Sequence, residues 1–405
     1  MKMIQTKTIK NEVIAGMTTF LTMSYIIIVN PSILSTPGTG MSFSGVMTAT
    51  ILLCFLMTLL MGIYAQLPIA VAPGMGINAF FTYSMILGEG IPWPVALGMT
   101  FWSGVFFLIV SLTPLRVWLV KNIPTSLKLA MSVGIGSFLI LIGLKNSEII
   151  VSHPVTFVQM GQFSSTMCLS IFGLVIIYVF SHLSTVFAPL LSIFTVTLAS
   201  YFLGKTSMPN SVFAPPDFQS VFFQLDIVHS LTWVFIPTIF TLMLTDLFDS
   251  ISTFVAISNQ ANLFDSNGEP KNIYRGLIVD SLATLSAGLL GTSAGTAYIE
   301  SAAGVSAGGR SGITAVVTAI CFIPFLFLGP LVAIIPAAAT APLLIFVGIL
   351  MLKNIQKVNW KDQSSYLPAL VALFITPLSF SITKGMVAAL ISYIVFNLNL
   401  RIFKK

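Results

Sequence analysis

The sequence predicts an all-α protein that crosses a membrane many times. Of its 405 residues, 56% are hydrophobic and only 7% are charged, whereas soluble domains carry about 25% charged residues. Apolar runs of about 20 residues, the length that one helix needs to cross a bilayer, recur along the whole chain. The longest polar interruption, residues 204–230, lies near the middle. These observations indicate a polytopic membrane fold made of two halves.

Counting the apolar runs gives fourteen predicted spans, most of them bounded by Pro, Gly, Asn or a charged residue. The first run follows a basic N-terminal segment, but it is longer than the apolar region of a signal peptide and no small-residue cleavage site follows it. We therefore expect this run to be retained as a span. The predicted spans are residues 12–30, 45–65, 70–88, 94–113, 127–145, 165–182, 185–203, 231–257, 273–290, 291–307, 311–328, 331–352, 364–382 and 384–402.

The distribution of basic residues predicts which side of the membrane each segment faces. With a cytoplasmic N-terminus and fourteen spans, all of the 18 Lys and Arg residues except Lys145, Lys205 and Lys384 fall on the cytoplasmic side. This is the asymmetry that the positive-inside rule describes. It predicts a multi-pass protein of the cell membrane with both termini in the cytoplasm. It also accounts for the net charge of +6 without a nucleic-acid partner.

The three cysteines, Cys54, Cys168 and Cys321, each lie in an apolar run and show no CxxC or Cys/His spacing. We therefore expect buried small side chains and neither a disulfide framework nor a zinc site. The sequence predicts no metal and no cofactor.

Residues 204–230 separate seven predicted spans from seven. Because seven is odd, the second half enters the membrane upside down relative to the first, as in the inverted repeats of many secondary transporters. Two segments at matching places carry small or helix-breaking residues: QLPIAVAPGMGINAFFTY at 66–83 and LLGTSAGTAYIES at 289–301. We expect both to begin as extended backbone and to become helical near Asn78 and Thr296. Free N–H groups and helix N-termini at membrane depth suit a polar ligand. The alternative is that these glycines only allow continuous helices to pack closely. That alternative could explain one such segment, but it explains two segments at matching places less well.

Two acidic residues lie close together in the eighth predicted span. Asp246 and Asp249, in TLMLTDLFDSISTF, are three residues apart and therefore on one helical face. A charged carboxylate at the bilayer centre costs at least about 2.5 kcal/mol, so such residues mark ion or substrate paths. Two carboxylates this close resist ionising together, which suits proton exchange. A sodium ligand and a structural carboxylate that accepts from N–H groups are the alternatives.

The other acidic residues differ in their expected roles. Glu300 is predicted one to two turns into the helix after the broken segment, where it projects toward the same midplane cavity. Asp280 follows RGLIV near the cytoplasmic end of the ninth predicted span, and we expect a structural role with Arg275 as its partner. The remaining acids fall in predicted loops or at span ends, where solvation explains them: Glu12, Glu89, Glu148, Asp217, Asp226, Asp265, Glu269 and Asp362.

Four stretches of the chain together carry a family resemblance: EVIAGMTTFLTMSYIIIVNPSIL near the start, APGMGINAFF, TDLFDSISTFVA, and GTSAGTAYIESAAGVSAGGRSG. They resemble the AzgA-like adenine/guanine/hypoxanthine permeases, a branch of the nucleobase–ascorbate transporter superfamily, and the resemblance covers nearly the whole chain. It implies seven plus seven inverted spans and the import of purine nucleobases by proton symport, with a core domain sliding against a gate domain like an elevator. It implies no enzyme activity, and it implies a gate surface that forms a homodimer. The implied domains are the core at residues 1–113 and 231–328, the gate at 114–204 and 329–405, and an extracellular connecting loop at 205–230.

The family's pattern of polar site residues is present in this sequence. Its substrate-binding Asn, eighth-span carboxylate and tenth-span glutamate fall on Asn78, Asp246 and Glu300, and its second eighth-span carboxylate falls on Asp249. The resemblance implies that the carboxylates accept hydrogen bonds from ring N–H groups and that Asn78 orients the core. Proton coupling is expected from Asp249, Asp246 or Glu300. Asp249, expected to face the core packing, is the proposed relay.

Apolar and backbone groups complete the site that the resemblance implies. Phe80 or Phe81 would stack on the purine ring, and backbone N–H groups near Gly295 and Thr296 would serve a purine carbonyl. Tyr298 is a further candidate for substrate binding.

Three other functions share part of this pattern. A uracil or xanthine permease of the same superfamily needs similar carboxylates and is the main alternative. A sulfate-type anion transporter would need a basic residue facing the cavity, and the sequence predicts no midspan Lys or Arg. An intramembrane aspartyl protease takes its two aspartates from different helices, whereas Asp246 and Asp249 lie on consecutive turns of one.

Overall fold

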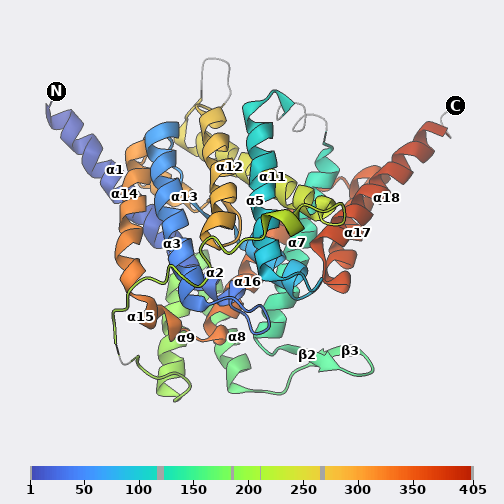
Figure 1. Cartoon of the computed structure of the whole chain (residues 1–405), viewed down its shortest axis with the longest axis horizontal. Helices are drawn as coiled ribbons and strands as arrows, with labels where there is room; N and C mark the ends of the chain where they lie inside the picture. The colour runs from blue at the N-terminus through green and yellow to red at the C-terminus, as the bar shows by residue number, and fades with distance from the viewer. Residues whose placement is uncertain (1, 116–122, 184–186, 210, 265–269, 403–405) are drawn as a thin grey trace.

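The computed structural model describes residues 2–115, 123–183, 187–209, 211–264 and 270–402. These residues form a bundle of helices with two short two-stranded sheets. Both chain ends project from the same side of the molecule, opposite the hairpin of β2 (Ile150–His153) and β3 (Phe157–Met160) (Figure 1). Several charged residues placed by the sequence in loops or tails lie outside the described residues: Arg116, Lys121, Asp265, Glu269, Lys404 and Lys405.

The predicted polytopic α-helical fold is confirmed. The count of fourteen stays a prediction, because several predicted spans consist of short pieces or shorter apolar helices. Within the described residues, eight helices are long and apolar enough to cross a bilayer: Ile9–Leu34, Phe43–Ala65, Trp93–Leu112, Thr125–Asn146, Ser165–His182, Ile236–Ala261, Ile273–Leu290 and Ala337–Lys357.

In the first half, one predicted span is broken where helix formation is impossible. Pro68 and Pro73 lack the N–H that a helix interior needs, and the chain runs as strand β1 before it becomes helical. The elements are α1 (Lys2–Met23), α2 (Ile26–Leu34), α3 (Phe43–Leu60), η1 (Met61–Ala65), β1 (Val71–Pro73), α4 (Met75–Ala79), η2 (Phe80–Ile86), α5 (Trp93–Leu112), α7 (Thr125–Asn146), α8 (Ser165–His182) and α9 (Ala188–Phe202).

In the second half, the matching break follows a glycine. Gly291 ends α12 with φ of 92°, a left-handed conformation that suits glycine, and the chain continues as strand β4. The elements are α10 (Ile227–Ser230), α11 (Ile236–Ala261), α12 (Ile273–Leu290), β4 (Gly295–Ala297), α13 (Ser301–Ser306), α14 (Gly312–Phe322), η3 (Ile323–Phe327), α15 (Gly329–Ala333), α16 (Ala337–Leu352), η4 (Lys353–Lys357), α17 (Gln363–Ser379) and α18 (Ile382–Ile402).

Packing contacts divide the helices into two groups. The first helix group contains α1, α3 and α5 together with α11, α12, α13 and α14, and the second contains α7, α8 and α9 together with α16, α17 and α18. In the second group, α7 and α16 cross closely at two glycines. A Cβ on Gly136 would lie 2.8 Å from the carbonyl oxygen of Gly348, so a larger side chain would push the helices apart.

Residues 211–230, which we call the strap, connect the two halves and bind to the first helix group. The backbone N–H of Ala214 donates to the carbonyl oxygen of Phe327 at 3.0 Å. The backbone N–H of Asp217 donates to the hydroxyl of Thr48 in α3 at 3.1 Å. The strap therefore joins elements from both halves of the chain.

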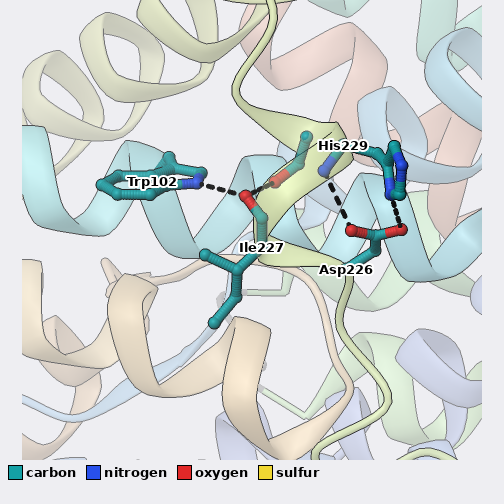
Figure 2. A network of polar contacts seen from close by, with 5 residues as sticks. Trp102, Asp226, Ile227 and His229 are labelled. Atoms are coloured by element: carbon teal, nitrogen blue, oxygen red, sulfur yellow. Dashed lines mark hydrogen bonds and ion pairs between the residues drawn. The ribbon is translucent and has the colours of Figure 1, made fainter.

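The end of the strap is held beside α5 by the contacts in Figure 2. The indole N–H of Trp102 donates to the carbonyl oxygen of Ile227 at 3.0 Å. Asp226 accepts from the backbone N–H of His229 at 2.9 Å, and the His229 ring lies 2.7 Å from its second oxygen. These hydrogen bonds from His229 lower the pKa of Asp226, so the carboxylate stays charged and caps α10.

Asp217 is the main polar anchor of the strap. Its carboxylate accepts from the hydroxyls of Ser44 at 2.8 Å and Ser220 at 2.5 Å, and from the backbone N–H of Gln219 at 3.1 Å. Partial burial alone would raise the pKa of Asp217, but the hydrogen bonds outweigh it and lower the pKa to about 2. The charged form therefore stabilises the folded strap.

Two expectations about burial are wrong. Glu12, expected to be solvated, is only 3% exposed. Its carboxylate accepts from the backbone N–H of Arg310 at 3.1 Å and from the hydroxyl of Thr314, because the first N–H groups of α14 lack partners within their own helix. Cys168, expected to be buried, is exposed on α8, whereas Cys54 is buried.

Candidate functional site

The two broken segments meet as strands in the interior of the first helix group. β1 and β4 pair antiparallel, with Ala72 opposite Thr296. The phenol of Tyr298 donates to the carbonyl oxygen of Pro73 at 2.7 Å, which ties the end of β4 to the end of β1. The expectation of extended backbone followed by a helix is confirmed in both segments. Thr296 lies within β4, however, and the following helix begins only at Ser301.

Glu300 lies between the strand and the helix. The expectation that it sits one to two turns into a helix is wrong, because Glu300 directly precedes α13, with φ of −58° and ψ of −20°. The backbone N–H of Tyr298 donates to the carbonyl oxygen of Ala70 at 2.9 Å, so the chain stays paired with the first segment beyond β4 and the helix starts later than the sequence suggests. Glu300 is half-buried and its neighbour Ile299 is exposed. The crossing strands therefore present the glutamate at the edge of the packed interior.

Tyr25 is the hydrogen-bond donor to Glu300. Its hydroxyl donates to the Oε1 atom of Glu300, and Tyr25 itself is buried. It lies between α1 and α2, where the first span is interrupted. Sequence reasoning missed this residue. The signal was available, since a tyrosine in an apolar span needs a partner for its hydroxyl.

The carboxylates of the predicted spans lie in two different environments, which differ in exposure. Asp249 is exposed on α11 and lies within electrostatic range of Glu300. Asp246, one turn earlier, is fully buried, and so is Asp280 on α12. The expectation that Asp249 faces the core packing is therefore wrong, because Asp246 occupies that position. The structure separates an accessible pair, Asp249 and Glu300, from an enclosed pair, Asp246 and Asp280.

Hydroxyl groups surround the enclosed pair. Thr284 donates to the Oδ2 atom of Asp246 and lies 3.0 Å from the carbonyl oxygen of Gly295. The hydroxyls of Ser250 and Thr296 are 2.7 Å apart. These contacts connect α11 and α12 to strand β4 through polar groups.

Asp280 lies in this polar interior. Ser250 lies beside it, but among the described residues neither carboxylate oxygen has a hydrogen bond of ordinary geometry. The expected partner, Arg275, instead lies over the ring of Tyr64, with its Cζ atom 5.8 Å from the ring centroid. Among the described residues, Arg275 and Asp280 form no ion pair. The predicted Asp280–Arg275 pair is wrong because Asp280 faces α11, next to Asp246.

A second enclosed polar cluster joins the two segments at α4. The side chain of Asn78 accepts a hydrogen bond from the hydroxyl of Ser293 at 2.5 Å. The amide of Asn30, in α2, donates to the hydroxyls of Thr50 at 2.6 Å and Thr292 at 2.7 Å. All five residues are fully buried. The role of Asn78 in substrate binding stays a prediction, and Asn30 was missed by sequence reasoning.

The aromatic and backbone candidates are packed into the interior. Phe80 and Phe81, in the π-helix η2, are fully buried. Gly295, Thr296 and Tyr298 are buried too, and their strand is held against β1. All five residues are therefore enclosed in the structure, and their roles in substrate binding stay predictions.

The site offers carboxylate and hydroxyl oxygens at membrane depth. Among the described residues, no group of three His, Cys, Asp or Glu side chains is placed to hold a metal ion. Carboxylates accept hydrogen bonds from N–H donors when ionised and can carry a proton. The arrangement therefore suits a ligand that presents N–H donors.

Comparison with known proteins gives consistent results. Residues 10–390 match the Permease family, Xan_ur_permease. The chain is 40% identical over 392 residues to the adenine permease AdeP of Escherichia coli (strain K12), covering 96% of this chain and 88% of that protein. It is 37% identical over 401 residues to the guanine/hypoxanthine permease PbuO of Bacillus subtilis (strain 168), covering 96% and 91%. Among solved structures, the transmembrane domain of the cyanobacterial bicarbonate transporter BicA is similar in fold, with a TM-score of 0.65 at 16% identity, covering 95% of this chain and 97% of that chain.

Proposed function

Because the chain belongs to the Permease family, we propose that it carries the purine nucleobases adenine, guanine and hypoxanthine across the cell membrane. As a permease it is a transporter and not an enzyme. The names of the two relatives support this substrate class, since one is an adenine permease and the other a guanine/hypoxanthine permease. The structural observation that carries the proposal is the presentation of Glu300 by the crossing strands, next to exposed Asp249.

The proposed binding mode uses the complementarity of purine edges and carboxylates. A purine offers ring N–H donors, which Glu300 and Asp249 accept. Tyr25 holds the Glu300 carboxylate in position through its hydrogen bond. Asp246 supports α11 from the enclosed side, and Asn78 holds the first segment against the second through Ser293.

The aromatic and strand residues have proposed roles around the same ligand. Gly295 and Thr296 place backbone groups beside the purine, and Tyr298 fixes the end of β4. Phe80 or Phe81 stacks on the base when the site closes around it.

The proposed transport cycle couples purine movement to protons. Asp249, Asp246 and Glu300 are the proposed proton-carrying groups, with Asp249 the most accessible of the three carboxylates. We propose that residues 1–113 and 231–328 form the moving core and residues 114–204 and 329–405 the gate. The division of helix contacts into two groups supports this assignment. Both termini are proposed to lie in the cytoplasm, and the gate surface is proposed to form a homodimer.

Uptake into proteoliposomes tests the proposal. Purified protein is reconstituted, and radiolabelled hypoxanthine, adenine and guanine are supplied with and without an inward proton gradient. We expect concentrative uptake with the gradient and equilibration without it. Uptake that depends on an inward sodium gradient would contradict proton coupling. Competition by uracil or xanthine that exceeds competition by all three purines would contradict the substrate assignment.

A further inference from the structure

A cavity of about 380 Å³ lies outside the crossing strands, and no residue of β1 or β4 lines it. It is lined by the end of η1, by residues between α11 and α12, and by the start of α14. The starts of α12 and α14 lie at the side of the molecule from which both termini project (Figure 1). In the predicted topology this is the cytoplasmic side. Neither Glu300 nor Asp249 lines this cavity, so it is separate from the proposed purine site.

Two cations line this cavity, and among the described residues neither has a carboxylate partner. They are Lys271 and Arg310. The Nη1 atom of Arg310 donates to the carbonyl oxygens of Val305 at 2.5 Å and Gly309 at 2.7 Å, which fixes the guanidinium in place. Glu12 lies close to Arg310, but it is buried, and its carboxylate accepts hydrogen bonds from the backbone N–H groups of Arg310 and Ser311 and from the hydroxyl of Thr314. The described lining of the cavity therefore contains two cations and no Asp or Glu, a charge balance that suits an anion.

The same cavity continues into an apolar surface. Ile63 and Ile313 line it and are 63% and 45% exposed. About two turns farther along their helices, Leu56 and Ile320 are exposed as well. These helices, α3 with η1 and α14, pack against each other. Two neighbouring rows of exposed aliphatic side chains thus lead from the cations into the membrane-spanning part of the molecule.

We propose that this cavity binds the phosphate headgroup of an anionic glycerophospholipid from the cytoplasmic leaflet. Lys271 and Arg310 contact the phosphate, and the acyl chains lie along Ile63 and Ile313. Basic pockets between helices on the cytoplasmic side are suited to anionic headgroups, and the apolar rows account for a ligand that carries chains. A free phosphate compound would use the cations but not the isoleucines.

The lining residues lie in η1, at the start of α14 or in segments that adjoin α11, α12 and α14, and η1 packs on α3, α12 and α14 of the first helix group. A bound lipid therefore attaches the group that carries Glu300 to one leaflet. The second helix group does not contribute to the cavity. The inference concerns binding alone and does not depend on which solute the protein carries.

Lipid binding is measured on the purified full chain in detergent by native mass spectrometry. The probes are phosphatidylglycerol and phosphatidylcholine of identical chains, with glycerol 3-phosphate as the chain-free compound. We expect preferential retention of phosphatidylglycerol, and we expect Lys271→Gln to weaken it about fivefold, the effect of one basic residue near an anionic lipid. Glycerol 3-phosphate in excess should not displace the lipid.

The matched control is Lys357→Gln, which removes an exposed cation of η4 outside the cavity and should leave lipid retention unchanged. Ile313→Ser tests the apolar wall and should weaken retention of the lipid. Equal losses for Lys271→Gln and Lys357→Gln would mean diffuse attraction by surface charge and would overturn the proposal. Displacement by glycerol 3-phosphate, or equal retention of the two lipids, would overturn it too.

Discussion

The two crossing segments share a backbone plan but differ in how the chain continues after the strand. After β1, the chain enters α4 at Met75 directly, and nearly every side chain from Leu67 to Ile86 is buried. After β4, three residues intervene before α13, and two of them, Ile299 and Glu300, reach the edge of the packed interior. The first segment is enclosed, whereas the second presents a carboxylate.

This difference shows how an inverted repeat can hold one ligand group in place. The strands support each other through the β1–β4 ladder. The polar side chain of the first segment, Asn78, bonds to Ser293 of the second. The first segment thus acts as a scaffold, and the second carries the group that meets the substrate.

The strongest test of this comparison replaces the carboxylate of each segment by an amide. Glu300→Gln should lower purine uptake about 10- to 100-fold, because a hydrogen bond to a charged group contributes about 1.5–3 kcal/mol. Glu89→Gln is the matched control at the end of the first segment, where the carboxylate accepts from Ser381 at 2.6 Å and an amide oxygen can accept as well. Initial uptake rates in proteoliposomes measure both. Equal losses of uptake in the two variants would contradict the idea that only the second segment carries a group that meets the substrate.

The second test weakens the scaffold itself. Asn78→Ala removes the 2.5 Å acceptor of the buried Ser293 hydroxyl and leaves it only the longer 3.4 Å contact with Asn30, which should cost about 1–2 kcal/mol of folding free energy. We expect the midpoint of thermal unfolding to fall by about 1–2 °C. Ser293→Ala should produce a smaller drop, because it removes the donor together with its need for a partner. If Asn78→Ala instead raised KM for purine at unchanged thermal stability, Asn78 would contact the substrate rather than support the strands.

The third test compares two tyrosines that bond to different parts of the crossing segments. Tyr25→Phe removes the donor to Glu300 and should raise KM for purine about 2- to 10-fold, the range of one hydrogen bond. Tyr298→Phe removes the bond to the backbone of Pro73 and should lower thermal stability more than it changes KM. Saturation curves and unfolding midpoints of both variants provide the measurement. An unchanged KM for Tyr25→Phe would contradict a positioning role.

Sequence patterns predicted the crossing segments because their cause is local. Pro68 and Pro73 cannot donate in a helix, and the small residues around Gly295 have weak helix propensity. The start of α13 was less predictable, because the chain before it is held by the backbone bond from Tyr298 to Ala70, and these residues are far apart in the sequence.

The burial and the partners of the acidic residues could not be predicted from the sequence, because they too depend on contacts between distant parts of the chain. A spacing of three places Asp246 and Asp249 on one side of α11 but does not say which of them faces α12. The partner of Asp280 was also misplaced, since proximity along the helix favoured Arg275, whereas tertiary packing put Asp280 beside Asp246. Each error concerns contacts between helices, which periodicity within one helix does not encode.

The smallest expected effect lies outside both crossing segments, at Asp217 in the strap. The folded pKa of about 2 is below the usual value of an unfolded aspartate, about 3.9. The charged carboxylate therefore stabilises the fold above about pH 4, and this contribution is lost as the pH falls toward 2. Because the group is largely solvent-screened, we expect Asp217→Asn to lower the unfolding midpoint by less than about 1 °C at pH 7. The difference from the unmodified protein should shrink as the pH falls below about 4. KM for purine should not change, because the strap contacts neither Glu300 nor Asp249. A changed KM would mean that the strap also positions the crossing segments, and the comparison would then have to include a third region.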